Sequence, residues 1–219
     1  MGSITRSLGN NITTGGVILP AGITNDSVSA VTSFANASGG TLILLSTQTA
    51  SNSATISFTT GLDSTYDAYE FHFINIRPAT DRVDFQFNGS TDGGSNYNVT
   101  KTTTTFFSAH NEADTVTSLS YDTGLDLAQS TAFQTLSTNQ GNGADECCIG
   151  VLQIFNPSST TYVKHFIFNG NHYANDDYMV EDFCAGYMNT TSAVNAIQFK
   201  MASGNITDGI FKLYGVKKS

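Results

Sequence analysis

Charged residues, proline and tryptophan are scarce in this sequence of 219 residues. Only 12 % of the residues are charged, three are Pro and none is Trp, whereas a typical globular domain is about one-quarter charged. Nine residues are Lys or Arg and 18 are Asp or Glu, so the formal net charge is -9. A surface that follows nucleic-acid phosphates needs clustered basic residues. We therefore expect no nucleic-acid partner.

Cysteine and long apolar runs are also scarce. The three cysteines, two of them adjacent at Cys147 and Cys148 and the third at Cys184, do not form an even disulfide framework, so we expect reduced, buried thiols. No segment reaches the roughly 18 apolar residues that span a bilayer, and the first residues lack a hydrophobic core of signal-peptide length. We therefore expect neither membrane insertion nor secretion.

Small polar residues are abundant instead. Thr, Ser, Asn and Gly together make up about 42 % of the chain, and these residues suit strands and turns rather than helix surfaces. Low charge with few aliphatic residues is also typical of disorder, but 15 Phe and nine Tyr, mostly in short alternating runs, supply the apolar surface that a folded core requires. The composition predicts an all-β protein.

The first 40 residues differ from the rest because single aliphatic side chains are scattered there without a period. We interpret residues 1–40 as an extended N-terminal arm, and residues 41–219 as a β body that begins after the Gly39-Gly40 pair. An extended segment can add a strand to the sheet edge of a partner. The side chains expected to bind such a partner are Ile4, Leu8, Ile12, Val17 and Ile18.

The body alternates apolar and polar residues in short runs separated by turn residues, which predicts strands. Nine to eleven strands without long helices favour an antiparallel β-sandwich of jelly-roll type. Phe85 lies in the clearest alternating run and should be buried, and a parity switch near Ile74 and Ile76 predicts a β-bulge. Residues 130–137 have helical spacing and give the only predicted helix. The predicted strands cover residues 41–46, 54–59, 69–76, 83–87, 97–107, 148–155, 162–168, 183–187, 193–201 and 210–216.

Two polar stretches contain residue types that bind metals. In the stretch His110-Asn111-Glu112-Ala113-Asp114, three possible metal ligands stand at alternate positions and would share one face of a strand, but a turn with solvated acids explains them better than a metal site. A second stretch lacks the spacing of a calcium loop, so an exposed acidic face is the favoured interpretation over a Ca²⁺ site. Its members are His172, Asp176, Asp177, Glu181 and Asp182. The sequence shows no catalytic motif, and we expect no cofactor.

Four tyrosines lie in polar surroundings rich in Asn and Asp, namely Tyr97, Tyr121, Tyr173 and Tyr178. Exposed aromatic rings beside amides are typical of surfaces that contact sugars, and equally of sheet rims and subunit interfaces. The absence of Trp favours the rim or interface interpretation, and a host surface glycan is the alternative partner.

Six stretches of the body combine turn residues with short strand-like runs. They are residues 57–67, 69–81, 87–97, 155–165 (FNPSSTTYVKH), 195–206 and 212–216 (KLYGV). These stretches resemble a family of virion structural proteins of tailed bacteriophages, especially marine ones. The resemblance covers most of residues 41–216, and the opening residues 6–13 are similar to the short arms of such proteins. It includes no catalytic motif.

The resemblance implies a non-enzymatic, multicopy component of the virion, assembled in the host cytoplasm. In our first hypothesis the arm binds other virion proteins of capsid or tail, and the exposed body serves as a tail fibre or receptor-contacting appendage. The first alternative is a decoration or cement protein on the capsid. A more distant alternative is a carbohydrate-active particle enzyme, for which residues 176–182 would be the place to look. A homo-oligomer, in particular a trimer, is expected from the habit of such β modules.

Overall fold

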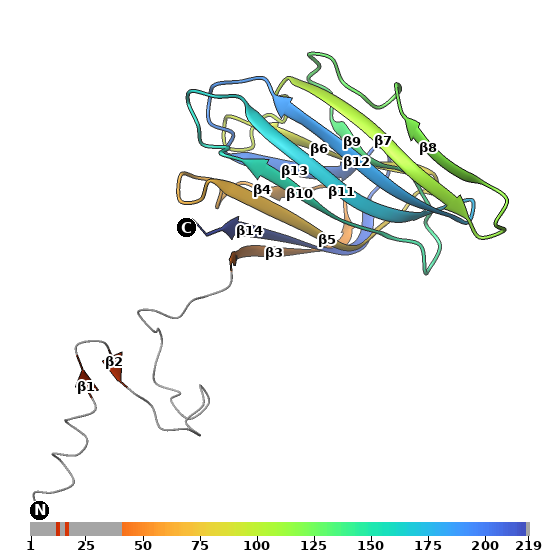
Figure 1. Cartoon of the computed structure of the whole chain (residues 1–219), viewed down its shortest axis with the longest axis horizontal. Coiled ribbons are helices and arrows are strands. Elements are labelled where there is room, and N and C mark those ends of the chain that lie inside the picture. Colours follow the sequence, from red (N-terminus) through yellow and green to blue (C-terminus); the bar gives the residue numbers. More distant parts are fainter. Residues whose placement is uncertain (1–11, 14–15, 18–40, 218–219) are drawn as a thin grey trace, which may run out of the picture. The chain divides into compact units, whose positions relative to one another are not determined.

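A computed structural model describes residues 12–13, 16–17 and 41–217 of the chain. The chain divides after Gly39 into two units, residues 1–39 and residues 40–219. In the first unit, the two-residue strands β1 (Ile12–Thr13) and β2 (Gly16–Val17) pair antiparallel, with Ile12 opposite Val17. The second unit, which we call the body, contains a sheet of 12 strands (Figure 1).

All regular secondary structure in the described part of the body is strand, and every pairing is antiparallel, so the predicted all-β antiparallel fold is confirmed. No helix that could cross a membrane occurs among the residues the structure describes. The strands are β3 (Leu42–Ser53), β4 (Ile56–Phe58), β5 (Ala68–Pro78), β6 (Val83–Ser90), β7 (Lys101–Asn111), β8 (Thr117–Tyr121), β9 (Gln134–Gln140), β10 (Cys148–Phe155), β11 (Lys164–Ala174), β12 (Tyr178–Met188), β13 (Ala196–Met201) and β14 (Ile206–Val216).

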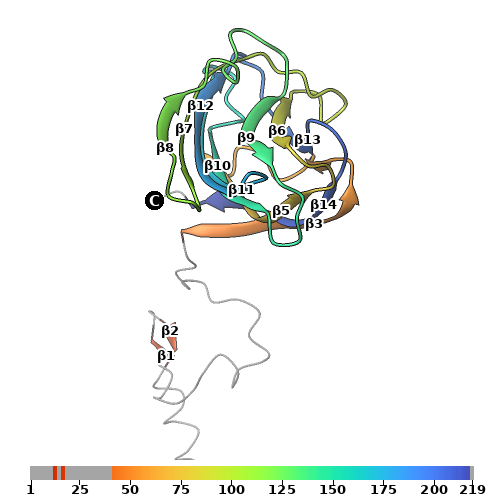
Figure 2. The same cartoon turned by 90° about the vertical axis from the view of Figure 1, so that its right-hand side faces the viewer.

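Eight of these strands pair in a nested order. β3 pairs with β14, β4 with β13, β5 with β10, and β6 with β9, which is the connectivity of a jelly roll. The pairs lie in two groups, β3-β14-β5-β10 and β4-β13-β6-β9, within one nearly closed sheet. Figure 2 shows these strands enclosing the interior of the body.

The other four strands come from two separate insertions, β7 and β8 between β6 and β9, and β11 and β12 between β10 and β13. They join side by side and continue the first group in the order β10-β11-β12-β7-β8. We call β11, β12, β7 and β8 the extension. A single paired position, Ala174 opposite Gln140, connects the extension to β9.

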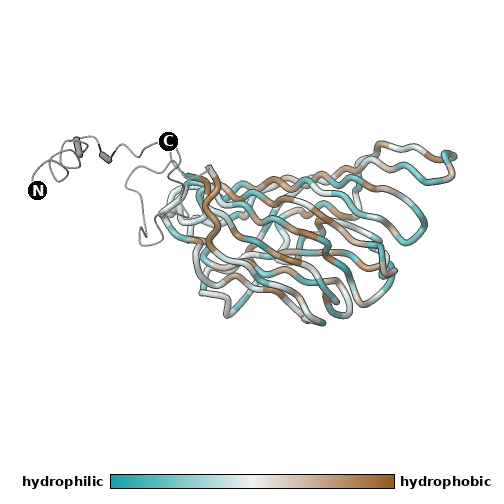
Figure 3. Tube along the Cα trace, turned by 90° about the horizontal axis from the view of Figure 1, so that it is seen from below, coloured by the Kyte–Doolittle hydropathy of each residue, from teal (hydrophilic) through white to brown (hydrophobic). Residues whose placement is uncertain are grey.

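Phenylalanine rings fill the interior of the jelly-roll part. Phe199 lies at the centre, with its ring 4.9 Å from that of Phe73 and 5.2 Å from that of Phe71. Phe85 is fully buried against Phe73, as the alternation predicted. Strands β5, β6 and β14 alternate buried and partly exposed residues over most of their length, because successive side chains of a strand point to opposite faces. Figure 3 shows hydrophobic and hydrophilic residues alternating along the strands of the body.

The predicted β-bulge in β5 is confirmed. Asn75 has a φ of 53°, and the pairing of β5 with both β10 and β14 shifts by one residue near it. The extra residue moves the inward positions from Phe73 to Ile76 and therefore keeps both ends of this long strand packed on the same core.

The helix predicted over residues 130–137 is wrong. Residues 134–137 begin strand β9, and Ser130 forms two backbone hydrogen bonds with Lys101, at 2.8 and 3.0 Å. The helical spacing of apolar residues there combines loop positions with the first inward positions of a strand. The strand predicted from Tyr97 begins only at Lys101, and the wholly exposed strand β8 has no predicted counterpart.

Candidate functional site

A recess of about 440 Å³ opens beside the turns that end β7 and β11. It brings together the two polar stretches noted in the sequence, because β12 lies between β11 and β7 and places Met179 opposite both Tyr173 and His110. Half of Met179 is exposed there. The lining residues are His110, Asn111, Glu112, Cys147, Asn171, His172, Tyr173 and Met179.

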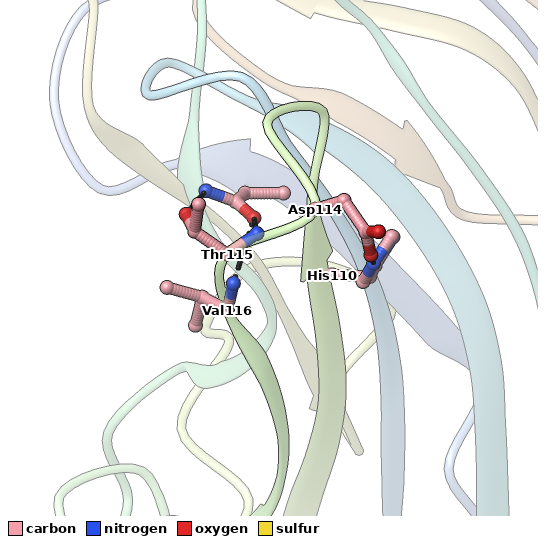
Figure 4. Close-up of polar contacts among 5 residues, drawn as sticks. His110, Asp114, Thr115 and Val116 are labelled. Carbon is pink, nitrogen blue, oxygen red and sulfur yellow. Dashed lines mark hydrogen bonds and ion pairs between the residues drawn. The ribbon is translucent and has the colours of Figure 1, made fainter.

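Asn111 organises the β7–β8 turn, of which Figure 4 labels His110, Asp114, Thr115 and Val116. Its side-chain oxygen accepts hydrogen bonds from the backbone N–H groups of Thr115, at 3.0 Å, and Val116, at 2.9 Å. Asp114 adopts a left-handed φ of 53°, which Asp tolerates better than most residues, and its carboxylate lies 3.1 Å from Nε2 of His110. The His110–Asp114 stretch is therefore a hydrogen-bonded turn, as the favoured interpretation of the sequence proposed.

Tyr173 connects this turn to the β11–β12 turn. Its hydroxyl donates to Oε1 of Glu112 at 3.2 Å and to Oδ1 of Asp177 at 3.1 Å, and the backbone N–H of Glu112 donates to the carbonyl of Asp177 at 3.0 Å. The hydrogen bond to Asp177, with that to Glu112, raises the pKa of Tyr173 to about 12, because both carboxylates favour the protonated hydroxyl. Tyr173 therefore remains a donor throughout the physiological pH range.

His172 and Asp182 of the second stretch lie inside the body, away from the exposed acids. Nδ1 of His172 lies 2.8 Å from Oδ2 of Asp182 and 2.9 Å from Oγ of Ser137 on β9. Nε2 of His172 is enclosed and has no hydrogen-bond partner. Ser137 and Asp182 both contact the same ring nitrogen, so they do not form the relay of a nucleophilic triad, in which Ser contacts the other nitrogen.

The remaining acids of that stretch point in different directions. Glu181 accepts a hydrogen bond from Nδ2 of Asn169 at 3.3 Å, while Asp176 forms an exposed ion pair with Arg82 at 2.5 Å. In the described part of the chain, no group of three His, Cys, Asp or Glu residues could hold a metal ion. The Ca²⁺ alternative therefore lacks a ligand set in these residues.

The four candidate tyrosines occupy separate environments. Tyr173 lines the recess, and Tyr121 is half exposed on β8, with its hydroxyl 2.8 Å from Asp126. Tyr178 is half-buried and faces another depression, one that Arg82 also lines. Tyr97 is half-buried, and its hydroxyl is enclosed without a hydrogen-bond partner. The structure does not assemble them into one sugar-stacking platform.

The arm residues selected from the sequence lie mostly beyond the described part of the chain. Ile12 belongs to β1 and Val17 to β2, where the two are paired. The other three, Ile4, Leu8 and Ile18, lie outside the described residues. Their predicted role in partner binding stays a prediction.

Two lysines that the sequence did not single out are fully buried. Nζ of Lys101 donates to Oδ1 of Asn88 at 2.6 Å and to the carbonyl of Val99 at 2.9 Å. Burial lowers the pKa of Lys101 to about 7, because desolvation disfavours the ammonium form. Nζ of Lys164 donates to three backbone carbonyls, at 2.6 to 3.0 Å. Both lysines lie opposite Met188 on β12, a pairing that no local sequence signal indicates.

Large apolar side chains gather on the outer face of β10 and the extension, which we define as the face turned away from the core. Seven of the 11 exposed large apolar residues in the described part of the chain lie there. A second recess, of about 470 Å³, opens on this face between Phe155 and Tyr187. The seven residues are Phe106, Leu119, Tyr121, Ile149, Phe155, Ile167 and Met179.

The first recess combines hydrogen-bonding groups with an apolar surface. It offers amide, imidazole and hydroxyl groups for hydrogen bonding beside the apolar surface of Met179. Burial raises the pKa of the Cys147 thiol above its usual value, so this thiol is a poor nucleophile at neutral pH.

Comparison of the chain with protein-family models, curated proteins and solved structures finds no match.

Proposed function

We propose that this chain is a non-enzymatic structural component of a tailed-phage virion, in which residues 1–40 anchor it to other virion proteins and the body is exposed as a tail fibre or receptor-contacting appendage. The assignment to a phage particle rests on the sequence resemblance described above. The observation that supports an assembled role is the apolar outer face, where residues such as Ile167 and Leu119 are at least half exposed. Exposed apolar side chains gathered on one face favour an interaction site.

The first recess supports a receptor-contacting role for the body. Tyr173, His110 and the side-chain amides line a depression near the end of the sheet, and such groups form hydrogen bonds with polar ligands such as the hydroxyls of a surface glycan. The two carboxylates beside Tyr173 both accept a hydrogen bond from its hydroxyl. Their common role is to join two turns, which favours binding over hydrolysis.

Deletion of residues 1–38 tests the anchoring role. We expect the truncated body to keep its β-sheet circular dichroism and its cooperative unfolding, but to be absent from purified particles assembled in its presence. The full-length chain, carrying the same tag, serves as the control and should be incorporated. Incorporation of the truncated chain at the full-length level would contradict an anchoring arm.

Immunogold labelling of particles carrying the full-length chain distinguishes the alternatives. Label confined to the tail supports the appendage, whereas label over the whole icosahedral shell would replace it with the decoration protein. Steady release of reducing ends from host polysaccharide by the purified chain would contradict the non-enzymatic role.

A further inference from the structure

Strand β8 forms a free edge of the sheet. Within residues 41–217 it pairs only with β7, and all five of its residues are exposed. Figure 1 shows no other strand beside its outer edge. The opposite edge strand, β3, is covered in part by β4, since Nε2 of Gln48 donates to the carbonyl of Ser57 at 2.7 Å. The edge strand β4 itself spans only three residues, and short edge strands are one way in which proteins limit edge pairing.

The backbone of β8 presents unpaired groups to solvent. Asn111 N–H donates to Val116 O, and Asp122 N–H donates to Thr105 O. In antiparallel pairs the hydrogen-bonded positions alternate with positions that face away. With this register, Thr117, Leu119 and Tyr121 direct their N–H and C=O groups outward. An added strand would therefore find three donors and three acceptors in the usual spacing, of which the carbonyl of Tyr121 also accepts a hydrogen bond from Oγ of Ser120 at 3.4 Å.

The side chains of β8 lack the features that protect natural edges. The strand reads Thr-Ser-Leu-Ser-Tyr, with no charged residue and no Pro, whereas exposed edges usually carry such residues to prevent pairing. The side chain of Leu119 is the most exposed large apolar one described, with 76 % of its surface accessible. Beside it on the outer face, Phe106 stacks on Phe183 with ring centroids 4.6 Å apart.

We propose that β8 pairs antiparallel with β8 of a second copy of this chain, about a two-fold axis through Leu119. The order of residues is complementary to itself in this register, because Leu119 lies opposite Leu119, Ser118 opposite Ser120, and Thr117 opposite Tyr121. Each outward-facing residue exchanges two backbone hydrogen bonds with its partner, so the pairing forms about six. Two extensions then become one continuous sheet.

The β8 strand itself carries no charge that would oppose a second copy. The chain carries a net charge of -9, so contacts between two copies generally bring acids together. At the β8 edge the strand is neutral, and the acid that follows it, Asp122, lies opposite Val116 in the proposed register. Like charges directly opposite each other on neighbouring strands are destabilising, and this register avoids them.

This two-fold contact does not depend on the virion role, and it leaves the expected trimer to other surfaces. A five-residue edge buries less area than a standard interface, so we expect weak association, at protein concentrations of roughly 0.1 mM and above. The contact therefore suits a protein held at high local concentration.

Disulfide trapping in the full-length chain tests the register. Cα atoms of a hydrogen-bonded antiparallel pair lie about 5.5 Å apart, within the range that a disulfide spans. In a Cys147→Ser background, Leu119→Cys should give a covalent dimer under mild oxidation. Thr117→Cys alone should stay monomeric, but should form a heterodimer when mixed with Tyr121→Cys. Equal crosslinking of all three variants alone, or of none, would overturn the proposal.

Sedimentation equilibrium at protein concentrations below and above roughly 0.1 mM is the second test. The wild type should show a monomer–dimer equilibrium, and Leu119→Lys should shift its midpoint at least tenfold toward the monomer, because the added charge opposes itself across the axis. Leu44→Lys, at another exposed site on β3, is the matched control and should behave as the wild type. A wild-type monomer at 1 mM, or an oligomer unchanged by Leu119→Lys, would overturn the pairing.

Discussion

The jelly-roll part and the extension bury different kinds of side chain. The jelly-roll part packs aromatic rings such as Phe71, Phe85 and Phe199 against one another. The extension contributes six of the 12 buried polar residues, and β9, the jelly-roll strand that it contacts, contributes four more. In the described part of the chain, these residues are Lys101, Thr103, Thr105, Gln134, Thr135, Ser137, Gln140, Lys164, His172 and Asp182.

This difference shows two ways of specifying strand neighbours. Burial of apolar area is non-directional, so the aromatic core supplies most of the stability without fixing each contact. Buried hydrogen bonds are directional and costly to leave unmade. Oγ1 of Thr103, for example, donates to Oε1 of Gln134 at 2.6 Å. Such contacts hold the inserted strands at defined positions.

Removing an aromatic ring from the jelly-roll core should give the largest effect. Phe85→Ala deletes a ring packed on Phe73, Phe199 and Phe211, and we expect it to reduce the free energy of unfolding by about 3 to 5 kcal/mol. Urea unfolding followed by circular dichroism measures this. Phe106→Ala, on the exposed outer face of the extension, is the control and should cost less than about 1 kcal/mol. Equal losses would remove the distinction between the two regions.

The buried lysine of the extension should make stability depend on pH. The pKa of Lys101 is about 7 in the folded chain against 10.5 for the ordinary side chain, so the unfolded chain binds more protons between these values. Stability should therefore rise as pH increases from about 7 to 10.5, by at most about 5 kcal/mol from this residue.

Lys101→Met removes this titrating group, so the difference in unfolding free energy between wild type and variant should change across that pH range. Urea unfolding at several pH values measures the two profiles. Parallel profiles would mean that the folded chain does not depress the pKa of Lys101. Burial of the Lys101 side chain in the extension would then carry no free-energy penalty for its charged form.

Breaking an exposed ion pair should give the smallest effect. The side chains of Arg82 and Asp176 are both more than half exposed, so we expect Arg82→Ala to change the free energy of unfolding by less than about 0.5 kcal/mol. Urea unfolding at low and high salt provides the measurement. A loss above 1 kcal/mol that disappears in salt would show that surface charge contributes to joining the extension to β6 and β9.

The sequence predicted the jelly-roll strands better than the extension for a physical reason. Residues 148–155 were predicted as a strand and form β10, because turn residues bound an apolar run. β8 has no buried position, so no hydrophobic pattern marks it. The buried Lys101 is recognisable only in the folded chain, because its side-chain partner Asn88 comes from another strand, β6.

The candidate recess was predictable in its parts but not in its assembly. The stretches that contain His110 and Tyr173 were both noted for their composition, and the structure places them on either side of β12. Residues more than 60 positions apart meet there because of strand order, which no local pattern encodes. The connection through the hydroxyl of Tyr173 follows from this order.

The order of strands in the extension also constrains co-translational folding of the chain. The hairpin of β7 and β8 is synthesised first, but its neighbour in the sheet, β12, ends only at Met188. Chains grow at roughly 5–20 residues per second, so about 70 residues and several seconds separate the hairpin from its docking strand. During that interval strands β7 and β8 have no completed sheet to join, so their exposed backbone and apolar side chains are available for a chaperone to bind.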